Sequence, residues 1–228
     1  LKDIDSDDLY GIQYTLFHMN ILPGLIAYAN HAAISDINES QHSFYGYASL
    51  SYNANITNGT DEIKGSYWRY SDNQTTLTRW NDLDEWNIET KGSASIDGAH
   101  YQNVSMNLTM INDKSDYYLE GPTGVNEQKI CLLNDSEYMA GRSYYYSHPA
   151  MNTTGTLVID GRMIKVHGDS WFDHQWGGFG ECFFAWDWFS LRLDNGSYIM
   201  LYSLKDQLLN DIPSQRHFGQ EHWGGRRQ

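Results

Sequence analysis

Residues 104–110 read VSMNLTM, with an apolar side chain at every second position. Successive side chains of a β-strand point to opposite faces, so this alternation predicts a strand with one buried face. Similar short runs recur at intervals of roughly 8–12 residues, separated by Asn, Asp and Gly. Asp97-Gly98, Asp160-Gly161 and Asn195-Gly196 are typical of hairpin turns. We therefore expect an all-β fold of antiparallel strands, built as a barrel or a sandwich.

The composition narrows the class of protein. The chain has 228 residues and a formal net charge of −14, which disfavours nucleic acids and anionic membrane surfaces as partners. No apolar run approaches the roughly 20 residues of a membrane-spanning helix, and the acidic start does not read as a signal peptide. Residues 128–139 are the one helix candidate. Two β domains are predicted, over residues 1–150 and 151–228, with the boundary in the stretch 144–155.

Asparagine sequons indicate a cellular compartment. Nine Asn residues lie in Asn-x-Ser/Thr sequons, where chance would give roughly two or three. This excess favours a secreted, glycosylated eukaryotic protein, and the alternative is a polar surface without glycans. The nine are Asn38, Asn55, Asn58, Asn73, Asn103, Asn107, Asn134, Asn152 and Asn195. Cys131 and Cys182, the only cysteines, could pair in that setting, but two cysteines leave the pairing open.

Residues 171–177, which read WFDHQWG, place a carboxyl, an imidazole and an amide among aromatic rings. A strand would put residues 171, 173 and 175 on one face and residues 172, 174 and 176 on the other. Rings solvate a carboxyl poorly, so the pKa of Asp173 should rise and the group could hold a proton near neutral pH. A general acid requires this property. The alternative is a core strand whose Asp bonds a neighbouring backbone N–H.

A second aromatic cluster, FFAWDWF, occupies residues 183–189. Its rings could line an apolar pocket and stabilise a cation through their π faces. The histidines are scattered, without HxH or HExxH spacing, so no metal site is expected. No GxSxG elbow or Gly-rich phosphate loop is present, and no cofactor is expected.

These blocks resemble the AttH, carotenoid 1,2-hydratase and kievitone hydratase family. The most specific blocks are WFDHQWG at 171–177 and WDWFSL at 186–191, followed by LDNG at 193–196 and MLY at 200–202. Towards the N-terminus, YGIQYTLF at 10–17 and HAAISD at 31–36 are similar to the early strands of the family. The resemblance implies two lipocalin-like β-barrel domains, of which the second would be incomplete here. We expect a secreted fungal member that lacks segments at both ends.

The resemblance also implies a reaction. Family members add water across an isoprenoid double bond: an acid protonates the alkene, a tertiary carbocation forms, and water captures it. The candidate catalytic residues are Asp173, His174 and Gln175. The candidate pocket residues are His31, Trp171, Trp176, Trp186, Asp187, Trp188 and Tyr202. The expected partner is a small hydrophobic molecule, prenylated or terpenoid.

Two other functions fit the same resemblance. The first is a pericyclase of the Diels–Alderase kind, which needs a shaped apolar cavity and no obligatory acid. The second is a non-catalytic lipocalin-like binder or a truncated paralogue. Asp173 separates a hydratase from a pericyclase, because only protonation requires it.

Overall fold

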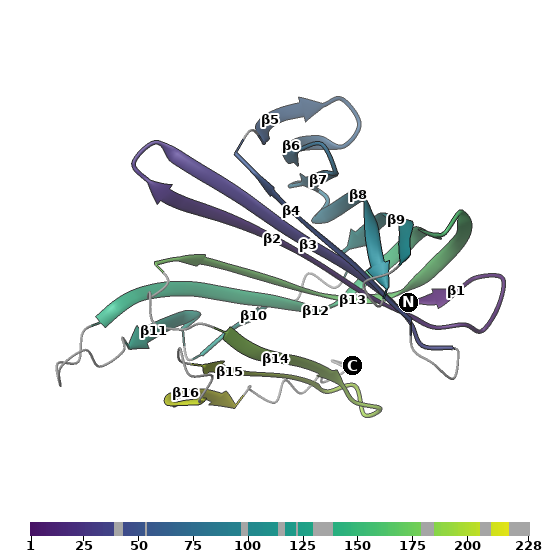
Figure 1. Cartoon of the computed structure of the whole chain (residues 1–228). Coiled ribbons are helices and arrows are strands. Elements are labelled where there is room, and N and C mark those ends of the chain that lie inside the picture. Colours follow the sequence, from purple (N-terminus) through teal and green to yellow (C-terminus); the bar gives the residue numbers. More distant parts are fainter. Residues whose placement is uncertain are drawn as a thin grey trace. The chain divides into compact units, whose positions relative to one another are not determined.

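The computed structural model describes residues 1–38, 43–52, 54–96, 100–113, 117–121, 123–129, 139–178, 185–205 and 211–218. In these residues all regular secondary structure is β-strand, and the strands pair antiparallel, which confirms the predicted class (Figure 1). The chain divides into two compact units. Unit 1 contains Leu1–Ser115 and Ala150–Ser170, and unit 2 contains Asp116–Pro149 and Trp171–Gln228.

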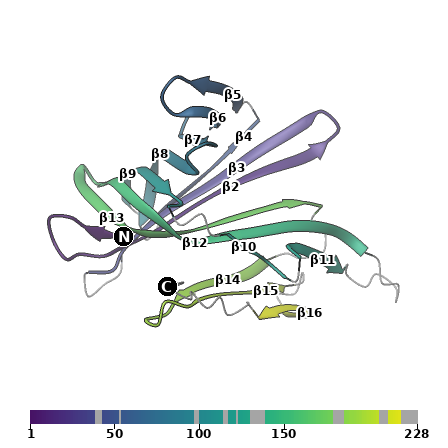
Figure 2. The same ribbon diagram turned by 180° about the vertical axis from the view of Figure 1, so that it is seen from behind.

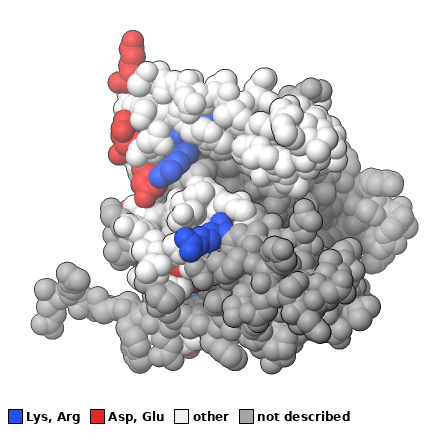
Figure 3. Space-filling model, turned by 90° about the vertical axis from the view of Figure 1, so that its left-hand side faces the viewer, with Lys and Arg blue, Asp and Glu red and all other residues white. Residues whose placement is uncertain are grey.

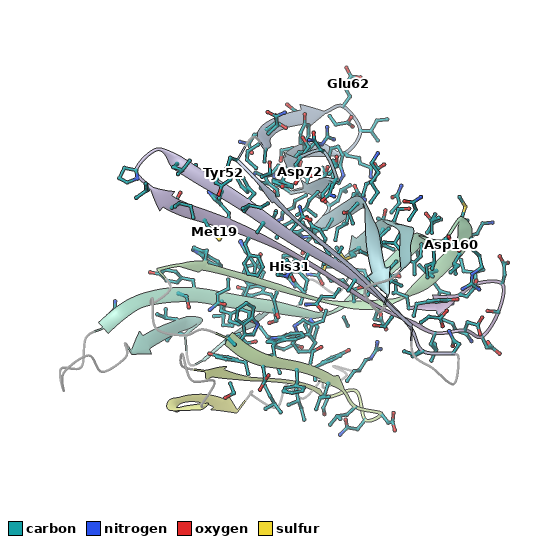
Figure 4. The ribbon with its side chains drawn as sticks, viewed as in Figure 1. Met19, His31, Tyr52, Glu62, Asp72 and Asp160 are labelled. Carbon is teal, nitrogen blue, oxygen red and sulfur yellow. The ribbon has the colours of Figure 1, made fainter. Side chains whose placement is uncertain are left out.

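Two long strands, β12 (Met139–Ile159) and β13 (Arg162–Gly177), each give one half to each unit. The units are therefore not the sequential halves 1–150 and 151–228, although one division falls at Pro149. Whether those halves are domains stays a prediction. A two-residue turn at Asp160-Gly161 joins the strands, and both residues have positive φ, as such a turn requires (Asp160 is labelled in Figure 4).

Unit 1 holds most of the largest sheet, whose strand order is β1-β13-β12-β9-β8-β7-β6-β5. The strands not yet placed are β1 (Lys2–Asp3), β5 (Asn55–Asp61), β6 (Gly65–Ser71), β7 (Thr75–Trp80), β8 (Glu85–Ile96) and β9 (His100–Ile111). A second sheet of the same unit consists of β2 (Tyr10–Leu22), β3 (Leu25–Asp36) and β4 (Ser43–Ser51). From β5 to β9, each strand pairs with the next along the chain.

The core of unit 1 is aliphatic. The alternation predicted at 104–110 is confirmed, because Val104, Met106 and Leu108 are buried while Asn107 is exposed. Leu108 and its neighbours pack with buried residues from β3, β12 and β13; the full cluster is Tyr10, Ala32, Ile34, Val104, Met106, Leu108, Leu157, Ile159, Ile164 and Val166. Burial of each large aliphatic side chain contributes about 1.5–3 kcal/mol.

Unit 2 is built on the other halves of β12 and β13. Strands β10 (Tyr118–Leu119) and β11 (Val125–Lys129) pair with β12, placing Tyr118 opposite Ser147 and Val125 opposite Tyr144. A separate sheet consists of β14 (Ala185–Arg192), β15 (Tyr198–Lys205) and β16 (Asp211–Phe218), which Figure 2 shows from behind. The helix predicted at 128–139 is wrong at both ends, where β11 ends and β12 begins. Residues 130–138 lie outside the described residues.

Of the remaining local predictions, the structure confirms one hairpin turn and does not describe the other turn or the two cysteines. The Asn195-Gly196 hairpin is confirmed: it joins β14 to β15, and the Leu193 N–H donates to the Ser197 carbonyl at 2.9 Å. The predicted turn at Asp97-Gly98 lies outside the described residues, and so do Cys131 and Cys182.

The sequon asparagines lie at the surface wherever the structure describes them. Eight of the nine are described and all eight side chains are exposed, while Asn134 lies outside the described residues. On the face drawn in Figure 3, acidic side chains gather along one edge, next to a few basic ones. In the described part of the chain, no helix is long and apolar enough to cross a membrane.

Candidate active site

In unit 2 the paired strands β12 and β13 present two chemically different faces. Residues 143, 145 and 147 of β12 share a face with residues 171, 173 and 175 of β13, as their mutual hydrogen bonds show. Residues 144, 146 and 148 share the opposite face with residues 172, 174 and 176, where their rings contact one another. The alternation predicted for 171–177 is therefore present. We call the face with residues 143, 145, 147, 171, 173 and 175 the acid face. The opposite face, with residues 144, 146, 148, 172, 174 and 176, is the aromatic face.

Asp173 lies at the centre of the acid face, held by side chains from both strands. Its Oδ1 accepts hydrogen bonds from Ser147 Oγ at 2.5 Å and from Trp171 Nε1 at 2.7 Å. Its Oδ2 accepts one from the Tyr145 hydroxyl at 2.8 Å. That hydroxyl in turn accepts from Trp188 Nε1 of β14, at 3.2 Å. Three side chains from β12 and β13 thus hold the carboxyl directly, and Trp188 of β14 holds it through Tyr145.

A second carboxyl, Glu120, joins this network directly after β10. It is 6% exposed, and its Oε1 lies 3.0 Å from Ser147 Oγ. Its backbone N–H donates to the carbonyl of Tyr145, which anchors it against β12. The sequence analysis did not find Glu120, because Tyr117 and Tyr118 precede it without the dense Trp and Phe block that surrounds Asp173. Glu120 reaches the site through strand pairing across 27 residues, for which the local sequence carries no signal.

Burial shifts the pKa values of the acid face upward. Burial raises the pKa of Asp173, and hydrogen bonds from Ser147, Trp171 and Tyr145 partly oppose this shift. Burial also raises the pKa of Glu120, to about 7; the nearby Asp173 charge adds to this rise, and the hydrogen bond between Glu120 and Ser147 opposes it. For Tyr145 and Tyr202, burial likewise raises the pKa, so both phenols are neutral at physiological pH. The site can therefore hold a carboxyl proton near neutral pH.

Aromatic rings of the β14–β15 sheet border the carboxyl. The ring centroids of Trp171 and Trp188 are 6.2 Å apart at 79°, and those of Trp171 and Tyr198 are 6.4 Å apart. Tyr202 is the register partner of Trp188, and Trp186 lies two residues along the same strand face. Trp186 and Trp188 remain 49% and 37% exposed to solvent.

Of the two other candidate catalytic residues, Gln175 lies on the acid face with Asp173, and His174 does not. Gln175 Nε2 donates to Ser143 Oγ at 2.9 Å. His174 lies on the aromatic face, where its Nδ1 is 3.3 Å from the Tyr146 hydroxyl and its ring centroid is 4.8 Å from that of Trp176. Their predicted roles stay predictions.

Two further candidates lie away from the acid face or in the other unit. Asp187 is exposed and alternates with Trp186 and Trp188 on β14, so it lies on the other face of that strand. His31 belongs to unit 1, on β3, with its ring centroid 5.3 Å from that of Phe17 (Figure 4). Within the described residues, no cluster of three or more His, Cys, Asp or Glu could hold a metal ion.

The fold and site define an all-β protein with a half-buried, hydrogen-bonded carboxyl beside indole rings. Comparison with known families assigns it further: the chain belongs to the AttH-like family, whose model matches residues 1–220. The resemblance inferred from the sequence is thereby confirmed.

Two solved structures share the fold. An AttH protein from Nitrosomonas europaea is 19% identical with a TM-score of 0.65, and kievitone hydratase from Nectria haematococca is 13% identical with a TM-score of 0.61. Each match covers 92% of this chain, but only 59% and 56% of the respective structures. No curated protein matches the chain in sequence.

Proposed function

We propose that this protein is a hydratase, which adds water to an isoprenoid or prenyl double bond of a small hydrophobic molecule by acid catalysis. Membership of the AttH-like family and the fold shared with kievitone hydratase support this class of reaction. The observation that carries the proposal is Asp173, a carboxyl whose burial raises its pKa and whose oxygens are fixed by Ser147, Trp171 and Tyr145. A general acid needs a raised pKa and a fixed position.

The proposed reaction has two steps. Protonated Asp173 gives its proton to one alkene carbon: its O–H bond breaks, the π electrons form a C–H bond, and a tertiary cation remains on the other carbon. The π faces of Trp171 and Trp188 stabilise this cation. Water then forms a C–O bond with the cation and returns its surplus proton to the Asp173 carboxylate. One water is added, and the acid is regenerated.

The hydrogen-bond network favours protonation over the pericyclase alternative. A pericyclic reaction needs a shaped apolar cavity and no acid, whereas three side chains here donate hydrogen bonds to the Asp173 carboxyl, and Trp188 donates one to its phenol partner. Secretion and glycosylation belong to the same proposal, and the exposure of the eight described sequon asparagines supports them.

The test uses kievitone, after which one structural relative is named, together with a panel of prenylated and terpenoid alkenes. We expect mass spectrometry to detect a product heavier by one water with at least one of them. Asp173→Asn should abolish this product, and Asp187→Asn is the matched control, because Asp187 is exposed on the other face of β14. A rearranged product without added water would favour the pericyclase. Ligand binding without any product would favour the binder.

A further inference from the structure

Ser147 lies between two carboxyl groups, and this constrains where the protons are. Its Oγ is 3.0 Å from Glu120 Oε1 and 2.5 Å from Asp173 Oδ1, both within hydrogen-bond distance. A serine hydroxyl has one hydrogen and can donate to one acceptor at a time, and an ionised carboxylate has none to donate. For both contacts to be hydrogen bonds, one of the two carboxyl groups must be protonated and must donate to Ser147 Oγ.

The fixed donors around Asp173 indicate which carboxyl carries that proton. An indole N–H can only donate. Trp171 Nε1 donates to Asp173 Oδ1, and Trp188 Nε1 donates to the Tyr145 hydroxyl oxygen, which leaves the hydrogen of Tyr145 for Asp173 Oδ2. Asp173 therefore accepts on both oxygens, as an ionised carboxylate does. The proton that Ser147 requires then lies on Glu120.

We propose that Glu120 holds the proton of the resting site and passes it through the Ser147 hydroxyl to Asp173 for use on the substrate. Glu120 is a positioning residue in this scheme, because it acts through Ser147 and Asp173. The use of the proton rests on the proposed hydration, whereas its location can be tested without any substrate.

The transfer is balanced. The Glu120 O–H bond breaks as a new O–H bond forms on Ser147 Oγ, while the original Ser147 O–H bond breaks as an O–H bond forms on Asp173 Oδ1. Ser147 ends with one hydrogen, as it began. After water has captured the cation, its surplus proton passes to Asp173 and returns along the same path to Glu120.

The groups that face Glu120 allow it to titrate near neutral pH. Among the described residues they are Asp173 of β13, Tyr145 of β12 and Tyr202 of β15, and none of these three is basic. Burial and the Asp173 charge raise the pKa of Glu120 to about 7. Both phenols stay neutral over this range, because burial raises their pKa values further above 10.

The first experiment locates the proton by carbon-13 NMR of the chain labelled at its Glu and Asp side-chain carboxyl carbons. We expect the resonance that disappears in Glu120→Gln to titrate with a midpoint near the pKa of about 7. The resonance that disappears in Asp173→Asn should titrate at lower pH. The reverse assignment, or an ordinary glutamate midpoint for Glu120, would overturn the proposal. Far-UV circular dichroism checks that each variant folds.

The second experiment tests the relay, which is the proton transfer from Glu120 through Ser147 to Asp173, with an alkene that the protein hydrates. Glu120→Gln keeps the size of the side chain and can still donate to Ser147, but it has no proton to transfer. We expect kcat at pH 7 to fall about 10²-fold, with the falling limb of its pH profile moved to lower pH. Ser147→Ala should act in the same way, while Ser147→Thr, which keeps a hydroxyl, should restore most of kcat.

A purely structural role would give a different result: kcat would fall by one factor at every pH, and the relay would be refuted. If the NMR midpoints are as expected but no alkene is hydrated, the location of the proton stands and the proposed function fails.

Discussion

Strands β12 and β13 are paired along both units, but their halves in unit 1 and in unit 2 present different kinds of side chain. In unit 1 these strands bury Leu157, Ile159, Ile164 and Val166 in an aliphatic core. In unit 2 the same two strands present hydroxyl, indole and carboxyl groups, which bond to one another around Asp173. The comparison shows that strand pairing builds the frame, and that the choice of side chain at alternate positions makes one half a core and the other a site.

The two halves also respond to change in different ways. An aliphatic core loses stability when volume is removed, whatever the pH. A buried carboxyl network responds to a change of one proton, because a buried charge is costly without partners. Substitutions in the two halves should therefore separate turnover from stability.

The largest expected effect is on turnover, in the unit 2 half. Asp173→Asn keeps the shape of the side chain but removes the group that delivers the proton in the proposed hydration. We expect kcat to fall by roughly 10²–10⁴-fold, the usual range for a general acid. Steady-state kinetics measures the loss, and ligand binding followed by tryptophan fluorescence should persist. Full turnover in this variant would contradict the acid role.

The next effect is on stability, in the unit 1 half. Leu157 is fully buried, opposite Met106 in the register of β12 and β9. Leu157→Ala should lower the free energy of unfolding by about 2–5 kcal/mol through lost burial and the cavity left behind. Urea unfolding measures this, and kcat per folded molecule should be unchanged. A loss below about 1 kcal/mol would show that this position is not tightly packed.

A smaller effect links stability to pH through Glu120. Its pKa rises on folding from 4.5 to about 7, so between these values the folded state binds more protons than the unfolded state. Stability therefore falls as pH rises through this window, and the loss is complete above about 7. The loss should be ~1–3 kcal/mol.

The Gln side chain of Glu120→Gln is neutral throughout this window, so the variant should lack the fall in stability that Glu120 causes as the pH rises. Urea unfolding of both proteins at several pH values between 4.5 and 8 tests it, with the window set by the pKa shift of Glu120. If the stability of the two proteins depended on pH in the same way, the raised pKa of Glu120 would be contradicted.

The smallest effect concerns the link between the two sheets of unit 2. Trp188→Phe keeps an aromatic ring but removes the Nε1–H that donates to the Tyr145 hydroxyl. Losing one neutral hydrogen bond and part of a cation–π contact should raise the barrier by about 0.5–2 kcal/mol. The ratio of kcat values reports this. A loss as large as that of Asp173→Asn would mean that Trp188 does more than support Tyr145.

The sequence predicts features that depend on residues close together in the chain, and it does not predict contacts between residues far apart in it. The alternation at 104–110 and the turn at Asp160-Gly161 are local, so the strands, their faces and the hairpin were predictable. Asp173 was predictable because its aromatic neighbours are adjacent in the chain. Glu120 and Ser147 were not, because the pairing of β10 with β12 brings them together across 27 residues. The division of β12 and β13 between the two units has no local signal, because no turn or loop marks it inside either continuous strand.

The identity of the added atoms tests the central claim most directly. The chain is incubated with a turned-over alkene in deuterated water, and separately in water enriched in the heavy oxygen isotope. If Asp173 protonates the alkene and water captures the cation, the product carries one non-exchangeable deuterium on carbon and one heavy oxygen on the neighbouring carbon. A product without carbon-bound deuterium, or with unlabelled oxygen, would contradict acid-catalysed hydration.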